Sequence, residues 1–146
     1  MASMAKKRIV AIVFLLLPLV IHAQEKDYKQ IYESYVKRIE NPSKEAKSQL
    51  EYVKSYFLTN GKEESEVYVV VLIRDQSWKW EQVYLRVLLW EEDQIGAQLV
   101  NEMTVVKGYP QGSEFVISTD RVVDWLIIHK DGEEEGNFIL NFFSKE

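Results

Sequence analysis

The chain has 146 residues, of which 47% are hydrophobic and 12% aromatic, so it is long enough for one domain with a packed core and too short for two ordinary domains. It contains no cysteine, which excludes disulfides, thiol nucleophiles, thiol redox pairs and thiolate metal sites. The fold must therefore be held together by packing and hydrogen bonds alone.

The first 23 residues have the pattern of a secretory signal peptide. A basic stretch that ends at Arg8 precedes the apolar run 9–21, and Ala23 offers a small residue at the cleavage position. An uncleaved membrane anchor is the alternative, but a spanning helix needs about 20 apolar residues and Pro18 interrupts this run. We therefore expect cleavage near Ala23 and export to the periplasm or out of the cell, with a mature form that is not embedded in a membrane.

Loss of Lys6, Lys7 and Arg8 leaves 15 of the 18 basic residues against 23 acidic residues, a formal charge of −8. This acidic balance argues against nucleic acid as a partner, because phosphate binding needs a basic face. A modest acidic charge is also an ordinary way to stay soluble, so the charge alone identifies no partner.

The mature chain begins with the pattern of two helices. Tyrosines and aliphatic residues recur at helical spacing over 25–40, and a second apolar stripe runs over 41–58. Asn41 and Pro42 suit the cap and the first position of the second helix, and Gly61 suits its C-terminal stop. The tyrosines can line a ligand groove, but we interpret the stripe as core.

After Gly61 the apolar pattern changes from the helical period to a period of two. The run 66–75 is apolar on both faces and is expected to be a central strand. The further strands are expected over 78–92, 95–102, 113–118, 121–130 and 137–143, with turns over 91–96 and 131–136. No helix recurs between the strands, which disfavours a parallel nucleotide-binding sheet. The sequence predicts one α+β domain over 24–146, with an N-terminal helical segment packed on one face of a twisted, mainly antiparallel sheet of about five to six strands.

Few residues point to catalysis or to a cofactor. His129 is the only histidine after Ala23, so a histidine triad or a histidine-rich zinc site has little to build on, and its place before a turn is typical of an exposed side chain. The acidic runs 91–93 and 133–135 lack the spacing of a calcium loop and are interpreted as solvated turns. No glycine-rich nucleotide motif occurs. We therefore predict no metal and no cofactor.

An aromatic group occupies the second strand and its approach. Trp78, Trp80, Tyr84 and Trp90 are separated by even numbers of residues, so a regular strand places all four on one face and Leu89 on the other. Such a face can bind a sugar, a peptide or a partner protein. It can equally be a second core face that the helices cover, and this is the interpretation that we favour.

The C-terminal half resembles a known family. The features are an aromatic strand residue (Tyr84), the motif G-x-x-L-x-N-E (96–102), a glycine before a strand (Gly112), the pair Asp124–Trp125 and a closing Gly136–Phe138 step. Their order resembles the bacterial YegJ-like family (domain of unknown function 2314), and the resemblance covers residues 67–143. That family usually has tryptophan where Tyr84 stands and proline where Met103 stands. The resemblance implies a fold and no activity.

Asp124 opens a hydrophobic strand, directly before Trp125. A buried and unpaired carboxylate would cost several kcal/mol there, so it must be exposed, neutral or well bonded. We interpret it as a structural latch to the 101–112 loop, and a catalytic acid is the alternative. Asp124, Trp125, Asn101 and Glu102 together form the candidate site.

Three functions are compatible with these features. We expect an exported, non-enzymatic binding or interaction module of the cell envelope, whose partner is a protein or an envelope ligand. One alternative is a small hydrolase that uses Glu102 and Asp124 as paired carboxylates about 5–10 Å apart. The other is an immunity or inhibitor protein for a toxin, since an acidic domain suits a basic toxin surface.

Overall fold

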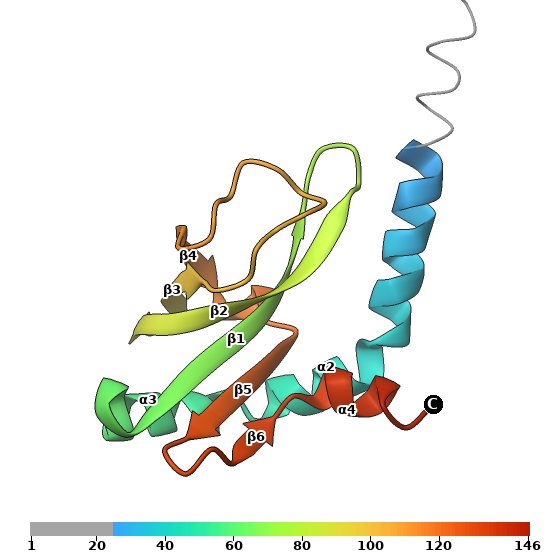
Figure 1. Ribbon diagram of the computed structural model, residues 1–146. Helices are drawn as coiled ribbons and strands as arrows, with labels where there is room; N and C mark the ends of the chain where they lie inside the picture. Colours follow the sequence, from blue (N-terminus) through green and yellow to red (C-terminus); the bar gives the residue numbers. More distant parts are fainter. Residues whose placement is uncertain (1–24) are drawn as a thin grey trace, which may run out of the picture.

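The computed structural model describes residues 25–146, without the side chains of residues 61–64. The predicted signal peptide over 1–23 lies outside this range. One open sheet has the strand order β4-β3-β2-β1-β5-β6, and every pair of neighbours is antiparallel (Figure 1). The strands are β1 (Ser65–Arg74), β2 (Trp80–Glu91), β3 (Gln94–Leu99), β4 (Glu114–Ser118), β5 (Asp124–His129) and β6 (Glu134–Gly136).

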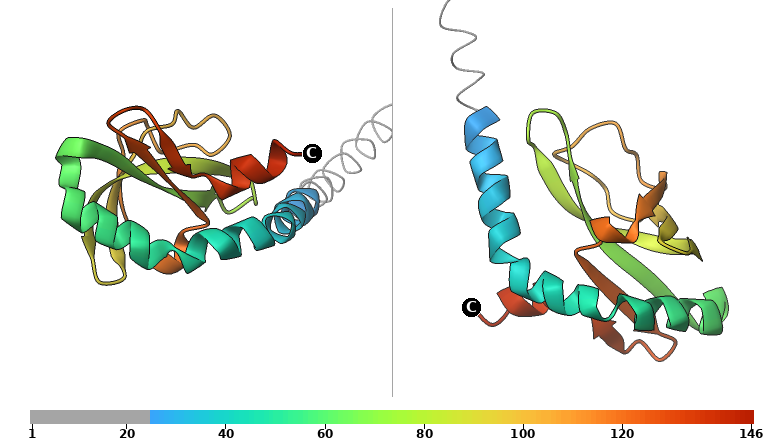
Figure 2. Two further views of the ribbon diagram at one scale, coloured as in Figure 1. Left: turned by 90° about the horizontal axis from the view of Figure 1, so that it is seen from below. Right: turned by 180° about the vertical axis from the view of Figure 1, so that it is seen from behind.

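One face of the sheet packs on the helices α2 (Glu40–Ser48) and α3 (Leu50–Glu64). Alternate residues of β1, among them Val69 and Val71, join Ala46 of α2 and Val53 of α3 in the main core. Figure 2 shows α2 and α3 following one another along the sheet. The predicted fold class is confirmed: the protein is α+β, with N-terminal helices packed on a six-stranded antiparallel open sheet.

The other face of the sheet carries a smaller core. Ile39, Leu72 of β1 and Ile139 of the short helix α4 (Phe138–Phe143) are buried together there. The helix over 25–38 stands beside this face and leaves α2 at a steep angle (Figure 1). Both faces of β1 are therefore covered, which explains why its sequence is apolar throughout.

The helix boundaries differ from the predicted ones. The first helix spans 25–38, and Ile39 is the boundary residue before α2, so Asn41 lies inside the first turn and does not cap it. Pro42 stands in the same turn, where a missing backbone N–H leaves no hydrogen bond unmade. Gly61 does not end α3, which continues to Glu64. An interior glycine costs a helix only about 1 kcal/mol, and the packing of α3 on the sheet outweighs that cost.

The prediction of a strand over 137–143 is wrong. The segment forms α4, while the sixth strand is Glu134–Gly136, within the predicted turn over 131–136. Gly136 and Asn137 have φ of 94° and 59°, a left-handed backbone that ends the strand before α4 begins. The other five strands agree with their predicted ranges except at boundary residues.

A β-bulge divides β2. The pairing with β3 shifts between Val87 and Leu89, so Leu88 is an extra residue and the alternation of side chains reverses beyond it. Leu89 is therefore 53% exposed and Trp90 only 3% exposed, the reverse of the predicted faces. Gly96 lies within β3 rather than in a turn, and a Cβ at this position would meet the Cβ of Leu89 at 3.3 Å.

Candidate functional site

Asp124 is the first residue of β5 and is only 1% exposed. The backbone N–H groups of Phe138 and Ile139 donate to its two carboxylate oxygens at 3.1 and 2.8 Å. The N–H of Trp125 donates to the same carboxylate at 2.8 Å. The carboxylate therefore accepts the amides of the first turn of α4, which have no partner within the helix itself.

Asp124 thus forms a latch between β5 and α4. The prediction that it bonds to the 101–112 loop is wrong. The reason is that residues 138–143 form a helix and not the expected strand. The first amides of this helix need an acceptor, which Asp124 supplies. Burial raises the pKa of Asp124 above its ordinary value, and the three amide bonds favour the charged form and offset part of this effect. Because both oxygens are already committed to amides, the arrangement weighs against a catalytic acid.

The other three residues of the predicted site do not gather around Asp124. Trp125 points to the opposite face of the sheet, into the main core, where its indole N–H donates to the carbonyl of Ala46 at 3.0 Å. The side-chain oxygen of Asn101 accepts the N–H of Tyr84 at 2.7 Å, beyond the end of β3. Glu102 is exposed, and no hydrogen bond of its side chain occurs within the described residues. The geometry therefore gives the paired-carboxylate hydrolase no support.

Glu81 of β2 holds the 101–112 loop, although it is not among the predicted site residues. Its oxygens accept the backbone N–H groups of Thr104, Val105 and Val106 at 2.9, 3.0 and 2.8 Å. Desolvation alone would raise the pKa of Glu81, but these bonds outweigh it and lower the pKa below the ordinary value. The sequence did offer one indication. Glu81 and Val83 are two residues apart and so lie on the same face of the strand, which makes a charged residue on this buried face unusual.

The aromatic face predicted for the second strand forms only in part, and the helix over 25–38 covers that part, as the core interpretation expects. Trp90 packs in the main core because the bulge at Leu88 turns it to that side. Trp78 and Trp80 instead contact Tyr32, with ring centroids 5.8 and 5.9 Å apart. These rings hold the helix over 25–38 against the sheet. Tyr84 is partly buried, and its hydroxyl donates to the side-chain oxygen of Asn137 at 2.7 Å.

His129 is partly buried rather than fully exposed. Its Nδ1 lies 3.1 Å from the hydroxyl of Tyr56, and its Nε2 lies 3.1 Å from a carboxylate oxygen of Glu135. The histidine thereby links α3, β5 and β6. Of the acidic runs predicted as turns, Glu92 and Asp93 do form the turn between β2 and β3, whereas Glu134 and Glu135 belong to β6.

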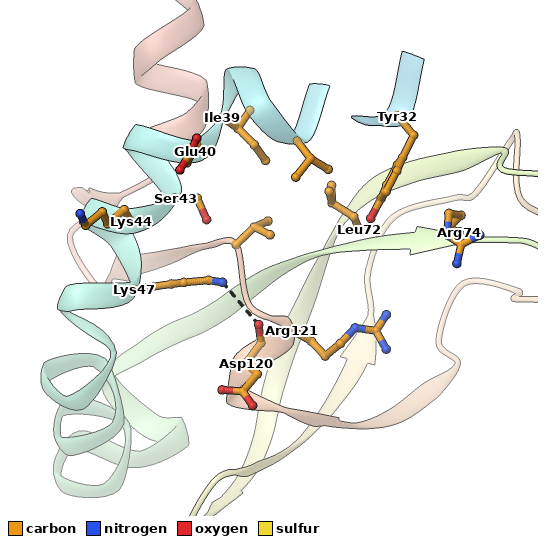
Figure 3. Close-up of a pocket in the computed structure, with 12 residues that line it drawn as sticks. Tyr32, Ile39, Glu40, Ser43, Lys44, Lys47, Leu72, Arg74, Asp120 and Arg121 are labelled. Atoms are coloured by element: carbon orange, nitrogen blue, oxygen red, sulfur yellow. Dashed lines mark hydrogen bonds between the residues drawn. The ribbon is translucent and has the colours of Figure 1, made fainter. Parts of the chain in front are cut away.

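A cleft of about 790 Å³ opens between the N-terminal helices and the end of β1 (Figure 3). Tyr32 and Val36 of the helix over 25–38 form part of one wall, and the 3₁₀ helix η1 (Thr119–Arg121) forms part of another. Aliphatic side chains, including Leu72 and Val123, contribute the apolar lining. The volume lies within the range of small-molecule sites, about 300–1,000 Å³.

The cleft is lined by an excess of cations. Its basic residues come from three elements: Lys44 and Lys47 from α2, Arg74 from β1 and Arg121 from η1 (Figure 3). Its acidic residues are Glu40 and Asp120. The cleft thus has a formal charge of +2 in a chain that is acidic as a whole.

The basic groups of the cleft differ in how they are occupied. Lys47 donates to the carbonyl of Asp120 at 3.4 Å, and the guanidinium of Arg74 lies 3.8 Å from the ring centre of Trp78. Within the described residues, Lys44 and Arg121 make neither a hydrogen bond nor an ion pair with their side chains. Arg121 therefore keeps its hydrogen-bonding capacity unspent, and Lys47, which points into the cleft, uses only one of its donors, whereas the ammonium of Lys44 is turned away from the cleft (Figure 3).

Comparison of the chain with protein family models, with curated proteins and with solved structures gave no match. The resemblance to the YegJ-like family therefore stays a prediction. In the part of the chain that the structure describes, no helix has the length and apolar character needed to cross a bilayer. No three His, Cys, Asp or Glu side chains gather around a possible metal position within the same residues.

Proposed function

We propose that the protein is an exported, non-enzymatic binding module whose cationic cleft takes an anion that carries an apolar portion. The observation that carries the proposal is the charge of the cleft, since four of its lining residues are basic in a chain with an acidic excess. A carboxylate or phosphate group would lie between α2 and η1, within reach of Lys47 and Arg121. The aliphatic part would lie against Leu72 and Val123.

The physical reason is the way in which a partly enclosed site combines the two kinds of contact. Guanidinium and ammonium groups form short, charge-assisted hydrogen bonds to carboxylate and phosphate. The apolar lining contributes through burial, at roughly 25 cal/mol per Å² of apolar surface removed from water. The aromatic contacts of Tyr32 with Trp78 and Trp80 support the binding function indirectly, because they hold one wall of the cleft in place.

The test is isothermal titration calorimetry of residues 24–146 with decanoate and with decylamine, which share an aliphatic chain and differ in the sign of the headgroup. We expect decanoate to bind, decylamine to bind far more weakly, and added salt to weaken the decanoate complex. Lys47→Gln and Arg121→Gln should each raise the Kd for decanoate about fivefold, the effect of one partly screened charge contact.

Lys130→Gln is the matched control, because Lys130 is exposed and lies outside the cleft. It removes one positive charge from the chain and should leave the Kd unchanged. Equal binding of decanoate and decylamine would contradict the proposal. So would an equal effect of all three substitutions, because the dependence on charge would then be a property of the whole protein.

A further inference from the structure

The two edges of the sheet are protected to different degrees. β6 has three residues, its first two are glutamates, and a left-handed residue ends it. β4 has five residues with the sequence EFVIS, in which Glu114 is the only charge and no proline or bulge occurs. Open edges that lack charges, prolines and bulges are templates for pairing with another strand.

The backbone of β4 offers its free groups at alternate residues. The N–H of Leu99 donates to the carbonyl of Ser113 at 2.8 Å, and the N–H of Thr119 donates to the carbonyl of Asp93 at 2.9 Å. In an antiparallel ladder the hydrogen-bonded positions alternate, so the odd-numbered residues of β4 bond to β3. The N–H and C=O groups of the even-numbered residues, with Val116 at the centre, therefore point away from the sheet.

The side chains at this edge are apolar and exposed. Val116 is 77% exposed and lies beside Gly96 of β3, which in turn pairs with Leu89 of β2, itself 53% exposed. A hollow of about 280 Å³ lies along this row, because Gly96 has no side chain to fill it. Val116 thus combines unpaired backbone groups with an apolar side chain that nothing in the described chain covers.

We propose that β4 pairs antiparallel with β4 of a second copy of this chain, so that the two sheets become continuous across a two-fold axis at Val116. In the register that overlaps all five residues, Val116 lies opposite its own copy and Glu114 lies opposite Ser118. One step further out, Asp120 lies opposite Gly112. No like charges meet, and every outward-facing residue exchanges both backbone bonds with the other copy. This pairing depends on no property of the cleft.

Sedimentation velocity tests the pairing directly. Residues 24–146, which contain all the described strands and helices, are compared by sedimentation velocity with Val116→Pro. Proline removes an N–H that points away from β3, so the fold is retained while the pairing is lost. We expect the unmodified chain to be a dimer at tens of micromolar and Val116→Pro to be a monomer that unfolds at a similar temperature.

Disulfide trapping provides a second measurement that does not need the proline variant to fold. Hydrogen-bonded residues across antiparallel strands have Cα atoms about 5.5 Å apart, a distance that a disulfide spans. Val116→Cys should therefore form a covalent dimer under mild oxidation, and Leu140→Cys, which is exposed on α4, should not. A monomeric unmodified chain, a dimer that persists in Val116→Pro, or equal cross-linking of the two cysteine variants would overturn the proposal.

Discussion

Two carboxylates, Asp124 in β5 and Glu81 in β2, each accept hydrogen bonds from three backbone amides. Asp124 is buried and fixes the helix α4, whereas Glu81 is partly exposed and fixes residues 104–106 of the 101–112 loop. Burial raises the pKa of Asp124 despite its bonds, while the bonds of Glu81 prevail over desolvation and lower its pKa. The same arrangement therefore shifts the pKa in opposite directions at two depths, because desolvation grows with burial and because Glu81 also accepts a bond from the hydroxyl of Thr104.

The largest expected effect breaks the buried latch without touching its carboxylate. Gly136 has φ of 94°, and a Cβ there would lie 2.4 Å from the carbonyl oxygen of Trp125. Gly136→Ala should lower the free energy of unfolding by about 4 kcal/mol, from left-handed strain and overpacking together. Gly132→Ala is the control, since its φ is 88° but no atom lies within 4 Å of its Cβ position. Chemical denaturation measures both, and equal losses would mean that the close approach to Trp125 has no energetic weight.

Removal of the buried carboxylate comes next. Asp124→Ala leaves the amides of Phe138 and Ile139 without an acceptor in a buried setting, and we expect a loss of about 3 kcal/mol. Asp124→Asn keeps one acceptor oxygen and should lose less. Urea titration followed by far-ultraviolet circular dichroism measures the loss. A free energy of unfolding that does not change in either variant would show that α4 does not depend on the latch.

The bonds that Glu81 accepts from the 101–112 loop should contribute less to stability than those of Asp124. Glu81→Ala should cost about 1 kcal/mol, because Thr104 and Val105 are exposed and their amides can bond to water instead. Hydrogen exchange should become faster at these amides and remain unchanged at Ile139 on the other latch. Glu102→Ala, an exposed acid in the same loop, is the matched control and should change neither stability nor exchange. Comparable effects of the two substitutions would contradict the assignment of Glu81 as the residue that holds the loop.

The smallest effect, and the sharpest comparison, is the dependence on pH. A raised pKa means that Asp124 contributes more stability when it is protonated. The free energy of unfolding of the wild type should therefore rise relative to that of Asp124→Asn as the pH falls from about 7 to about 4. A lowered pKa means that Glu81 contributes stability when charged, so the wild type should lose its advantage over Glu81→Gln only as the pH falls below 4.5, the ordinary value for glutamate. Unfolding free energies of the three proteins against pH test this, and slopes of the same sign would contradict it.

The sequence by itself determined the sheet-rich α+β fold, because alternation over β3 and β4 and the apolar β1 leave little choice of secondary structure. It also showed that a carboxylate beside Trp125, if buried, must be neutral or well bonded, since an unpaired charge costs several kcal/mol there. It did not locate the cleft, whose cations come from α2, β1 and η1 and meet only when the chain is folded.

Tertiary structure alone decided the remaining features. The residues 138–143 are apolar enough for either a strand or a helix, and the acceptor supplied by Asp124 selects the helix. One extra residue at Leu88 reverses the face of Trp90, which no count along the sequence can show without the partner strand. In each case the deciding hydrogen bond or pairing comes from a distant part of the chain, so local pattern cannot carry it.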